Sequence, residues 1–380
     1  MLQESDTFLI TPLEHQNIVW FKASNTYVIT EKLTTELLIQ ISQNISENDL
    51  IKWCKQSLGL HKSQSLILIN KTKALYNNQN TAKILTPTPQ YFKKPSLQDQ
   101  IIYFYQIAHQ VFKVSFENEA LAFLIHPKFA HLCVAEADFD FDFKVYFNNQ
   151  DVVLEVDKSV IGIWKKKEIE YFQGKFSMCL IEKLYQKPEA DWMGVFHASA
   201  ISDGKNSILF TGDSGNGKST LAALLMAKGW DLLADDFAPM ASKNSQIYYF
   251  PAAISIKENA VPSLSDYFPK LNTTTQHYFK NLNKKVRYLA PTLNQKNQIE
   301  HLPCKALVFV KYDKNIDLKC EKMSQELAFQ QLIPDAWLSS ETNNAQQFLD
   351  WFATMPCYQL TYSDNELMYQ TAHKLFNDDL

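Results

Sequence analysis

Gly212-Asp-Ser-Gly-Asn-Gly-Lys-Ser219 decides the fold of this chain, because it has the spacing of a complete phosphate-binding (Walker A) loop. The run before it, 207–211, has the apolar, β-prone residues expected of the strand that enters such a loop. After it, leucines recur at helical spacing up to Lys228, and Gly229 can end that helix. Strand, loop and helix in this order predict a site for a nucleoside triphosphate.

Each part of this loop has a physical role in holding phosphates. Its glycines let successive backbone N–H groups turn toward the phosphates, Lys218 reaches the β and γ oxygens, and the Ser219 hydroxyl can ligate Mg²⁺. ATP and Mg²⁺ are therefore the predicted cofactors. The predicted cofactor-binding residues are Gly212, Asp213, Ser214, Gly215, Asn216, Gly217, Lys218, Ser219 and Thr220.

Composition restricts the class of protein. With 380 residues and 46% hydrophobic content, the chain can bury a large core and is expected to form two domains. A net charge of −4 gives no general attraction to nucleic acid or to an anionic membrane. No apolar run approaches the roughly 18 residues of a membrane span, and the first residues lack a secretory signal. A cytoplasmic protein with reduced cysteines is expected, without a nucleic-acid or membrane partner, and a homo-oligomer is compatible with the sequence.

The chain has a single arginine, Arg287, among 37 Lys and Arg residues. Lysine is thus used almost everywhere that a positive charge suffices. The exception marks a position that needs a planar, permanently charged group, and bidentate recognition of a phosphate or a carboxylate is the usual such need. An arginine that occurs by chance in a surface loop is the alternative.

The pattern along the chain predicts an accessory domain at 1–110 and a catalytic domain at 111–380. In the first, 32–43 and 47–58 have helical periodicity, with Ser46 as the N-cap of the second helix, and 21–30 and 65–70 have strand character. In the second, the pattern predicts a hairpin over 139–156, a helix over 172–185, and strands over 194–200, 231–234 and 306–312. Three aspartates of the hairpin, Asp138, Asp140 and Asp142, fit a solvated strand face better than a calcium site.

Two carboxylates, Asp235 and Asp236, stand at the end of the first strand after the phosphate loop. Only one helix and one strand separate them from Lys218, so the fold brings them toward the phosphates. The two carboxylates of an acidic pair beside a magnesium nucleotide can have different roles. One carboxylate takes a proton from an attacking hydroxyl, and the other holds the metal.

Three segments together resemble one known family. Phe196-His-Ala-Ser199, the phosphate loop, and Leu233-Ala-Asp-Asp236 are similar to the catalytic domain of HPr kinase/phosphorylase and of the HPr-kinase-related kinases. The resemblance covers roughly 115–380, is most specific at 195–240, and extends to the nucleotide-binding core of phosphoenolpyruvate carboxykinase. It implies an α/β fold, with a P-loop-containing kinase domain and a smaller N-terminal α+β accessory domain.

The resemblance also implies roles for individual residues. Asp235 would be the general base, Asp236 would support the metal, and Glu258 is a further metal candidate. His197 matches a histidine near the catalytic aspartate of the family, although a histidine in a strand is as often a structural residue. Arg287 would stabilise charge on the transferring phosphoryl group.

The sequence departs from the family in ways that limit what can be carried over. Thr220 stands where the founding enzymes have Glu, and their arginine-rich loop is not recognisable here. The substrate HPr and the reverse phosphorolysis are therefore not transferred to this chain. In the accessory domain, Thr26-Tyr-Val-Ile-Thr30 and the two helices through Leu58 are similar to PqqD-like domains, which bind leader peptides. A plain accessory domain remains the alternative.

The leading hypothesis is an ATP-dependent kinase that phosphorylates a hydroxyl, most simply Ser or Thr of a peptide or small protein. A small-molecule hydroxyl would be served by the same chemistry. A nucleotide-dependent sensor without transfer activity is the alternative from another class. A transport ATPase and a GTPase are disfavoured, because neither Leu-Ser-Gly-Gly nor Asn-Lys-x-Asp follows the loop.

Overall fold

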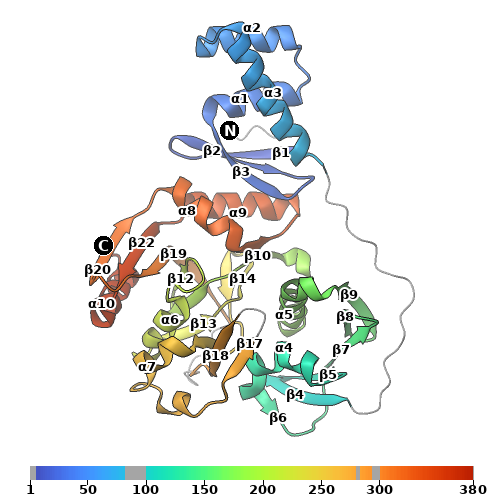
Figure 1. The fold of residues 1–380 in the computed structure, drawn as a ribbon, viewed down its shortest axis with the longest axis vertical. Coiled ribbons are helices and arrows are strands. Elements are labelled where there is room, and N and C mark those ends of the chain that lie inside the picture. Colours follow the sequence, from blue (N-terminus) through green and yellow to red (C-terminus); the bar gives the residue numbers. More distant parts are fainter. Residues whose placement is uncertain (1–5, 82–99, 280–282, 293–299, 380) are drawn as a thin grey trace. The chain divides into compact units, whose positions relative to one another are not determined.

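The computed structural model describes residues 6–81, 100–279, 283–292 and 300–379. The chain divides into two compact units (Figure 1). The first unit contains Met1–Thr86 and Met323–Met355, and the second contains Pro87–Lys322 and Pro356–Leu380. Both units contain helices and β-sheets, so the chain is a mixed α/β protein.

The first unit is built on a three-stranded antiparallel sheet followed by three helices. The strands run in the order β1 (Phe8–Pro12), β2 (Gln16–Phe21) and β3 (Thr26–Glu31), and the helices are α1 (Lys32–Ser42), α2 (Glu47–Leu58) and α3 (Lys62–Gln79). Apolar side chains of the sheet, Val19 and Phe21, pack with Leu38 of α1 in one buried cluster.

The structure confirms both predicted helices of this unit and corrects both predicted strands. The predicted strand over 21–30 begins only at Thr26, because 22–25 form the turn between β2 and β3. The side chain of Ser46 accepts a hydrogen bond from the Asp49 backbone N–H, as expected of an N-cap. The predicted strand over 65–70 is wrong, because these residues lie within α3. Its buried residues, Ser65, Ile69 and Thr72, follow the spacing of a helix, which a short apolar run alone does not reveal.

Two helices from late in the sequence belong to the first unit. They are α8 (Gln325–Leu332) and α9 (Thr342–Thr354), with the short strand β21 (Ala336–Leu338) between them. The ring of Tyr27 in β3 lies 6.0 Å from that of Phe329 and 5.4 Å from that of Phe348. The observed division therefore differs from the expected one at 1–110 and 111–380, because an insertion between two strands of the second unit packs on the first.

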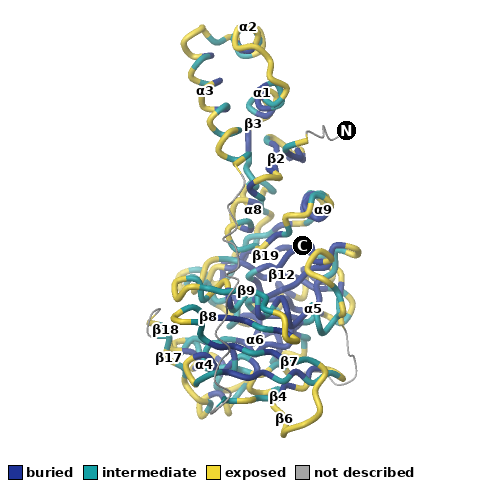
Figure 2. The backbone as a smooth tube through the Cα atoms, turned by 90° about the vertical axis from the view of Figure 1, so that its right-hand side faces the viewer, coloured by how far each residue is buried: buried dark blue, intermediate teal, exposed yellow. Residues whose placement is uncertain are grey.

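The second unit contains a central sheet, which we define as the strands β13, β11, β12, β19, β15, β14 and β10 in spatial order. Their bounds are β10 (Trp192–Phe196), β11 (Ser199–Ser202), β12 (Ser207–Thr211), β13 (Asp231–Ala234), β14 (Ala238–Ala241), β15 (Gln246–Tyr248) and β19 (His301–Tyr312). β22 (Cys357–Tyr362) pairs with the last half of β19 and with β20 (Leu318–Lys322). β12 is buried along its whole length (Figure 2).

Strand directions bring four carboxyl ends to one edge of this sheet. β12 is parallel to β19, and β19 is parallel to β22. β13 and β12 are both antiparallel to β11, so they run in the same direction. The helix α6 (Lys218–Ala227) starts at this edge, and its apolar residues share a buried cluster with residues of β12, β19 and the last helix, α10 (Asn365–Asn377). Ligands of α/β proteins bind at such an edge.

Two smaller sheets complete the second unit. One has the order β16 (Ile254–Lys257), β18 (Lys284–Leu289) and β17 (His277–Phe279), with the short helix α7 (Val261–Leu264) beside it. The other has the order β6 (Cys133–Val134), β4 (Ile101–Ile107), β5 (Gln110–Phe116), β7 (Phe141–Asn148), β8 (Asp151–Val156) and β9 (Ser159–Trp164), with the helices α4 (Glu119–Phe129) and α5 (Ile169–Tyr185).

The predicted hairpin and the helix over 172–185 are confirmed as β7–β8 and α5. The predicted continuous strand over 194–200 is wrong, because the chain turns between β10 and β11. At this break the backbone N–H of Ala198 donates to the carbonyl of Phe196 at 2.9 Å. His197 therefore lies at a corner rather than inside a strand.

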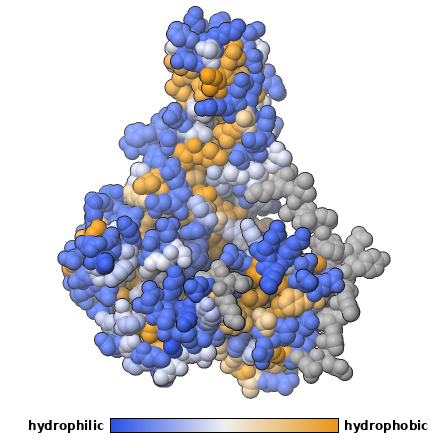
Figure 3. Space-filling view, viewed as in Figure 1, coloured by the Kyte–Doolittle hydropathy of each residue, from blue (hydrophilic) through white to orange (hydrophobic). Residues whose placement is uncertain are grey.

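The face of the second unit drawn in Figure 3 is largely hydrophilic. Throughout the described parts of the chain, no helix has the length and apolar character required to cross a membrane.

Candidate active site

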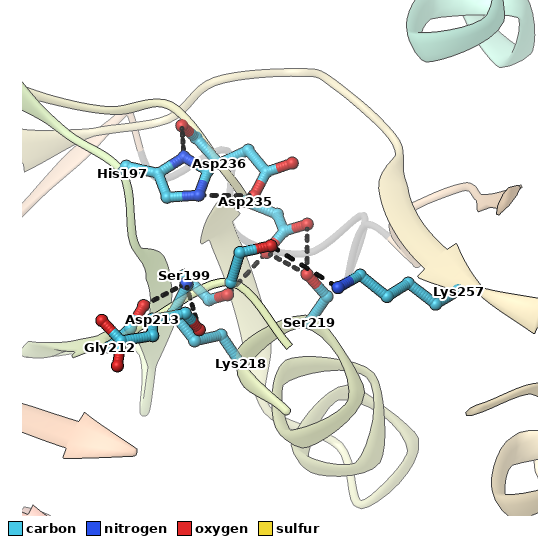
Figure 4. A network of polar contacts seen from close by, with 10 residues as sticks. His197, Ser199, Gly212, Asp213, Lys218, Ser219, Asp235, Asp236 and Lys257 are labelled. Atoms are coloured by element: carbon cyan, nitrogen blue, oxygen red, sulfur yellow. Dashed lines mark hydrogen bonds and ion pairs between the residues drawn. The ribbon is translucent and has the colours of Figure 1, made fainter. Parts of the chain in front are cut away.

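The phosphate loop connects β12 to α6 in a conformation that needs glycine. Gly212 has φ of +136°, and a Cβ on it would lie 2.6 Å from the carbonyl oxygen of Val310 in β19. Gly217, at the start of α6, has φ of +89°. The ammonium of Lys218 donates to the carbonyl of Gly212 and lies 3.4 Å from that of Asp213 (Figure 4). This loop conformation is the one that the sequence pattern predicts, with the lysine inside it.

Asp235, which directly follows β13, contacts two serines, Ser199 in β11 and Ser219 at the end of the loop. Its Oδ1 accepts a hydrogen bond from the Ser199 hydroxyl at 2.5 Å. The hydroxyl of Ser219, at the start of α6, lies 3.1 Å from Oδ2 and 3.3 Å from Oδ1 (Figure 4). Asp235 is only 3% exposed. The carboxylate thus touches the serine that the loop pattern assigns to the metal.

Burial disfavours the charged form of this carboxylate. It raises the pKa of Asp235 to about 7, and the charge of the neighbouring Asp236 adds to the effect. The hydrogen bonds from Ser199 and Ser219 act in the opposite direction but do not outweigh it. The protein therefore holds a carboxylate where a nearby cation would relieve an unfavourable charge.

Asp236 faces a different environment although it is the next residue. Its φ of +63° is unusual for a residue other than glycine and turns its side chain toward His197. The His197 Nε2 lies 3.7 Å from Asp236 Oδ1, and Nδ1 lies 3.3 Å from the Asp236 carbonyl oxygen (Figure 4). The side chain of Asp236 is 27% exposed, so an incoming group can reach it.

Positive charges keep Asp236 ionised. Burial alone would raise its pKa, but His197 and the lysines Lys128, Lys284 and Lys218 outweigh burial and hold the pKa below its usual value. These cations come from α4, β18 and α6 and from the corner before β11. Several elements of the second unit therefore converge on this one carboxylate.

Lys257, the last residue of β16, also faces the loop and was missed by the sequence analysis. Its Nζ lies 3.5 Å from the Ser214 hydroxyl oxygen, and 3.5 Å from the position of a Cβ on Gly215 (Figure 4). Burial lowers the pKa of Lys257, and the charges of Lys284 and Lys218 lower it further. Nothing in its sequence position singles it out among the chain's many lysines, because it comes close to the loop only when Ile254 and Ile256 of β16 pack in the buried cluster that contains α6.

The structure does not bring Arg287 and Glu258 to the loop. The Arg287 Nε donates to Glu258 Oε2 at 3.1 Å and Nη2 donates to Oε1 at 3.3 Å, a bidentate contact. The same guanidinium donates to the carbonyls of Asn272 and Thr274. The single arginine thus recognises a carboxylate of its own chain, and its role at a phosphoryl group and that of Glu258 at a metal stay predictions.

The contacts favour an exchange of the roles that the sequence predicts for the two aspartates, with Asp235 at the metal and Asp236 as the base. Asp235, expected as the base, lies against Ser219, the residue that the loop pattern assigns to Mg²⁺. Asp236, expected at the metal, is the more exposed carboxylate and lies beside His197. His197 thus lies beside Asp236, whereas the resemblance implies a histidine near the catalytic aspartate, which was expected to be Asp235.

The residues present are compatible with Mg²⁺. Within the described residues, no group of three or more His, Cys, Asp and Glu side chains forms a metal cage. Mg²⁺ does not require one, because it usually takes one or two protein oxygens and completes its shell with phosphates and water. Ser219 and Asp235 offer such a pair of oxygens.

Comparison of the chain with known protein families and with curated proteins finds no match. The function of the site is therefore argued from the geometry and the chemistry of its residues.

Proposed function

We propose that this protein is an ATP- and Mg²⁺-dependent kinase of the HPr-kinase-like type, which transfers the γ-phosphoryl group to a Ser or Thr hydroxyl of a peptide or small protein. The observation that carries the proposal is the contact of Ser219 in the phosphate loop with Asp235, next to a second, more exposed carboxylate. A protein that only binds a nucleotide needs the first carboxylate but not the second.

The loop and its lysines would bind and orient the donor. Backbone N–H groups of the loop and the Lys218 ammonium hold the β and γ phosphates, and Lys257 adds a cation from the other side. Mg²⁺, when held by Ser219 and Asp235, would neutralise negative charge on the phosphate oxygens. A γ-phosphoryl group held in this way would be open to in-line attack, and positioning with charge neutralisation supplies most of the catalysis in such reactions.

Asp236 would act as the general base toward the acceptor hydroxyl. Its carboxylate takes the proton of the attacking hydroxyl while a bond forms between that oxygen and the γ-phosphorus. The bond from the γ-phosphorus to the bridging oxygen breaks, and ADP leaves with that electron pair. His197 and Lys284 keep Asp236 ionised for this step, since both lower its pKa.

The acceptor class is proposed from the first unit. β3, α1 and α2 are the elements on which the resemblance to PqqD-like domains is based, and all three are present. A domain of that type supports a peptide acceptor over a small metabolite.

Separate substitution of the two aspartates tests this function. With γ-labelled Mg-ATP and Ser/Thr peptides, Asp236→Asn should keep Mg-ATP binding while the transfer rate falls by about 10² to 10⁴. Asp235→Asn should lose the Mg²⁺ dependence of ATP binding. Asp203→Asn, at an exposed turn before β12, is the matched control and should change neither. Tight Mg-ATP binding with no transfer to any hydroxyl would instead favour the sensor.

A further inference from the structure

Tyr312, the last residue of β19, lies against the phosphate loop with its side chain in solvent. The residue is 52% exposed. Its backbone N–H donates to the carbonyl of Asn216 at 3.1 Å, and its Cβ lies 3.4 Å from the position that a Cβ on Gly217 would occupy. Single exposed aromatic residues are common on protein surfaces, so the exposure carries little by itself. The contact with the loop is what distinguishes this tyrosine.

The order of strands determines which side of the loop Tyr312 occupies. On one side of β12 lies β11 and then β13, which leads into Asp235 and Asp236. On the other side lies β19, which ends at Tyr312, and then β22. All these ends except that of β11 share one edge of the sheet. The two carboxylates and the exposed tyrosine are therefore on opposite sides of the phosphate loop.

A nucleoside triphosphate bound at this loop has a defined direction under the proposed function. Its γ-phosphate lies at the aspartates, because the acceptor is activated there. The base is at the far end of the same linear molecule, so it extends beyond the loop on the other side. That side is the carboxyl end of β19, where ligands of α/β sheets commonly bind.

A second tyrosine holds Tyr312 in place. Tyr362, the last residue of β22, is 1% exposed, and its ring meets the Tyr312 ring edge to face, with centroids 5.8 Å apart. The Tyr362 hydroxyl also lies 3.5 Å from the position of a Cβ on Gly217. The exposed ring is thus supported by a buried ring that itself touches the loop, and a supported ring loses little freedom when a ligand stacks on it.

We propose that Tyr312 is the stacking platform for the base of the nucleotide. This inference rests on the proposed function, because the direction of the nucleotide follows from the roles of the aspartates. Stacking on an aromatic ring accepts any base, since every base has a π face. The site therefore takes a nucleoside triphosphate in preference to inorganic triphosphate.

Binding measurements with two probes test this proposal. The dissociation constants of Mg-ATP and of Mg-tripolyphosphate would be measured by calorimetry for the wild type and for Tyr312→Ala. Loss of one base–aromatic stack should weaken Mg-ATP binding by roughly tenfold or more and leave tripolyphosphate binding unchanged. Tyr312→Phe keeps the ring and should bind Mg-ATP like the wild type. Tyr171→Ala removes an exposed ring elsewhere and is the matched control.

The outcomes separate this inference from the proposed function. Wild-type binding of Mg-ATP that Tyr312→Ala leaves unchanged would overturn the stacking role and leave the kinase proposal intact. Equal weakening of both probes would also overturn it, because the substitution would then act through the loop. Failure of the wild type to bind either probe would overturn both proposals.

Discussion

The charged residues around the phosphate loop (Lys218, Asp235, Asp236 and Lys257), here called the loop cluster, and the Arg287–Glu258 pair differ in how their charges are satisfied, although Lys257 and Glu258 are consecutive residues. Lys257 ends β16 and points to the loop, whereas Glu258 follows it and binds Arg287 on the neighbouring strand β18. Lys257 is the last residue of the strand, and Glu258 begins a short 3₁₀ turn (Glu258–Ala260), so their side chains contact different partners. The loop cluster contains charges of both signs, whereas Glu258 and Arg287 form a single matched ion pair.

The pKa shifts of Glu258, Lys257 and Asp235 show the difference between the ion pair and the loop cluster. Hydrogen bonds from Arg287, and then from Gln276, lower the pKa of Glu258, so its charge is favoured. Burial and neighbouring cations lower the pKa of Lys257, and burial raises that of Asp235, so folding disfavours both of these charges. Such unfavourable charges concentrate where a ligand brings the compensating charge. This difference supports the proposed binding role of the loop cluster and indicates that the ion pair contributes to stability.

Among the variants that compare the loop with the ion pair, Lys257→Met should have the largest effect. Lys257→Met removes the cation that faces the loop from β16, and the transfer rate from Mg-ATP should fall by about 10² to 10³. The free energy of unfolding should stay the same or rise, since folding disfavours this charge. Steady-state transfer assays and thermal unfolding measure the two. Lys205→Met, at an exposed turn, is the control, and an unchanged rate for Lys257→Met would remove Lys257 from the site.

The two aspartates should respond to pH in opposite directions when the metal is removed with a chelator. The folded pKa of Asp235, about 7, lies above its unfolded value of 3.8, so the stability that this group contributes is present below 3.8 and is lost as pH rises through 7. At pH 8 Asp235→Asn should therefore be more stable than the wild type, by roughly 1 to 3 kcal/mol. At pH 4 the difference should vanish.

Asp236→Asn is the matched variant for this test. The pKa of Asp236 lies below its usual value, so its ionised form stabilises the fold above pH 3.8 and that stability is lost as pH falls. This variant should be less stable than the wild type at pH 8. Thermal unfolding at pH 4, 6 and 8 measures both, and a common direction for the two variants would contradict the assigned environments.

Local sequence was enough to predict the loop, its strand and helix, and the acidic pair, because they follow one another within the short stretch 207–236. The different surroundings of Asp235 and Asp236 were not predictable, since they depend on Ser199 and on the positive φ of Asp236. Lys257 could not be found for a related reason. It comes close to the loop because β16 packs in the same buried cluster as α6, a contact that the sequence pattern alone does not provide.

The packing of α8 and α9 on the first unit shows the same limit on a larger scale. These helices have ordinary amphipathic sequences, and their periodicity does not indicate which surface of the protein they pack against. The rings of Phe329 and Phe348 find their partner in Tyr27, about three hundred residues earlier in the chain. Contacts over such separations follow from the fold and not from any local propensity.

Arg287→Lys should give the smallest effect on turnover and tests the other side of the comparison. Lysine keeps the charge but cannot make the bidentate contact to Glu258 together with the bonds to two carbonyls. The free energy of unfolding should fall by about 1 to 2 kcal/mol, and the transfer rate should change by less than about tenfold, because the guanidinium contacts lie outside the loop. Glu258→Gln should lower stability in the same way. A fully folded Arg287→Lys protein whose transfer rate falls about 10³-fold would instead place this arginine at the phosphoryl group, where arginines act in other phosphoryl-transfer enzymes. Arg287 would then take part in catalysis as well as in stability.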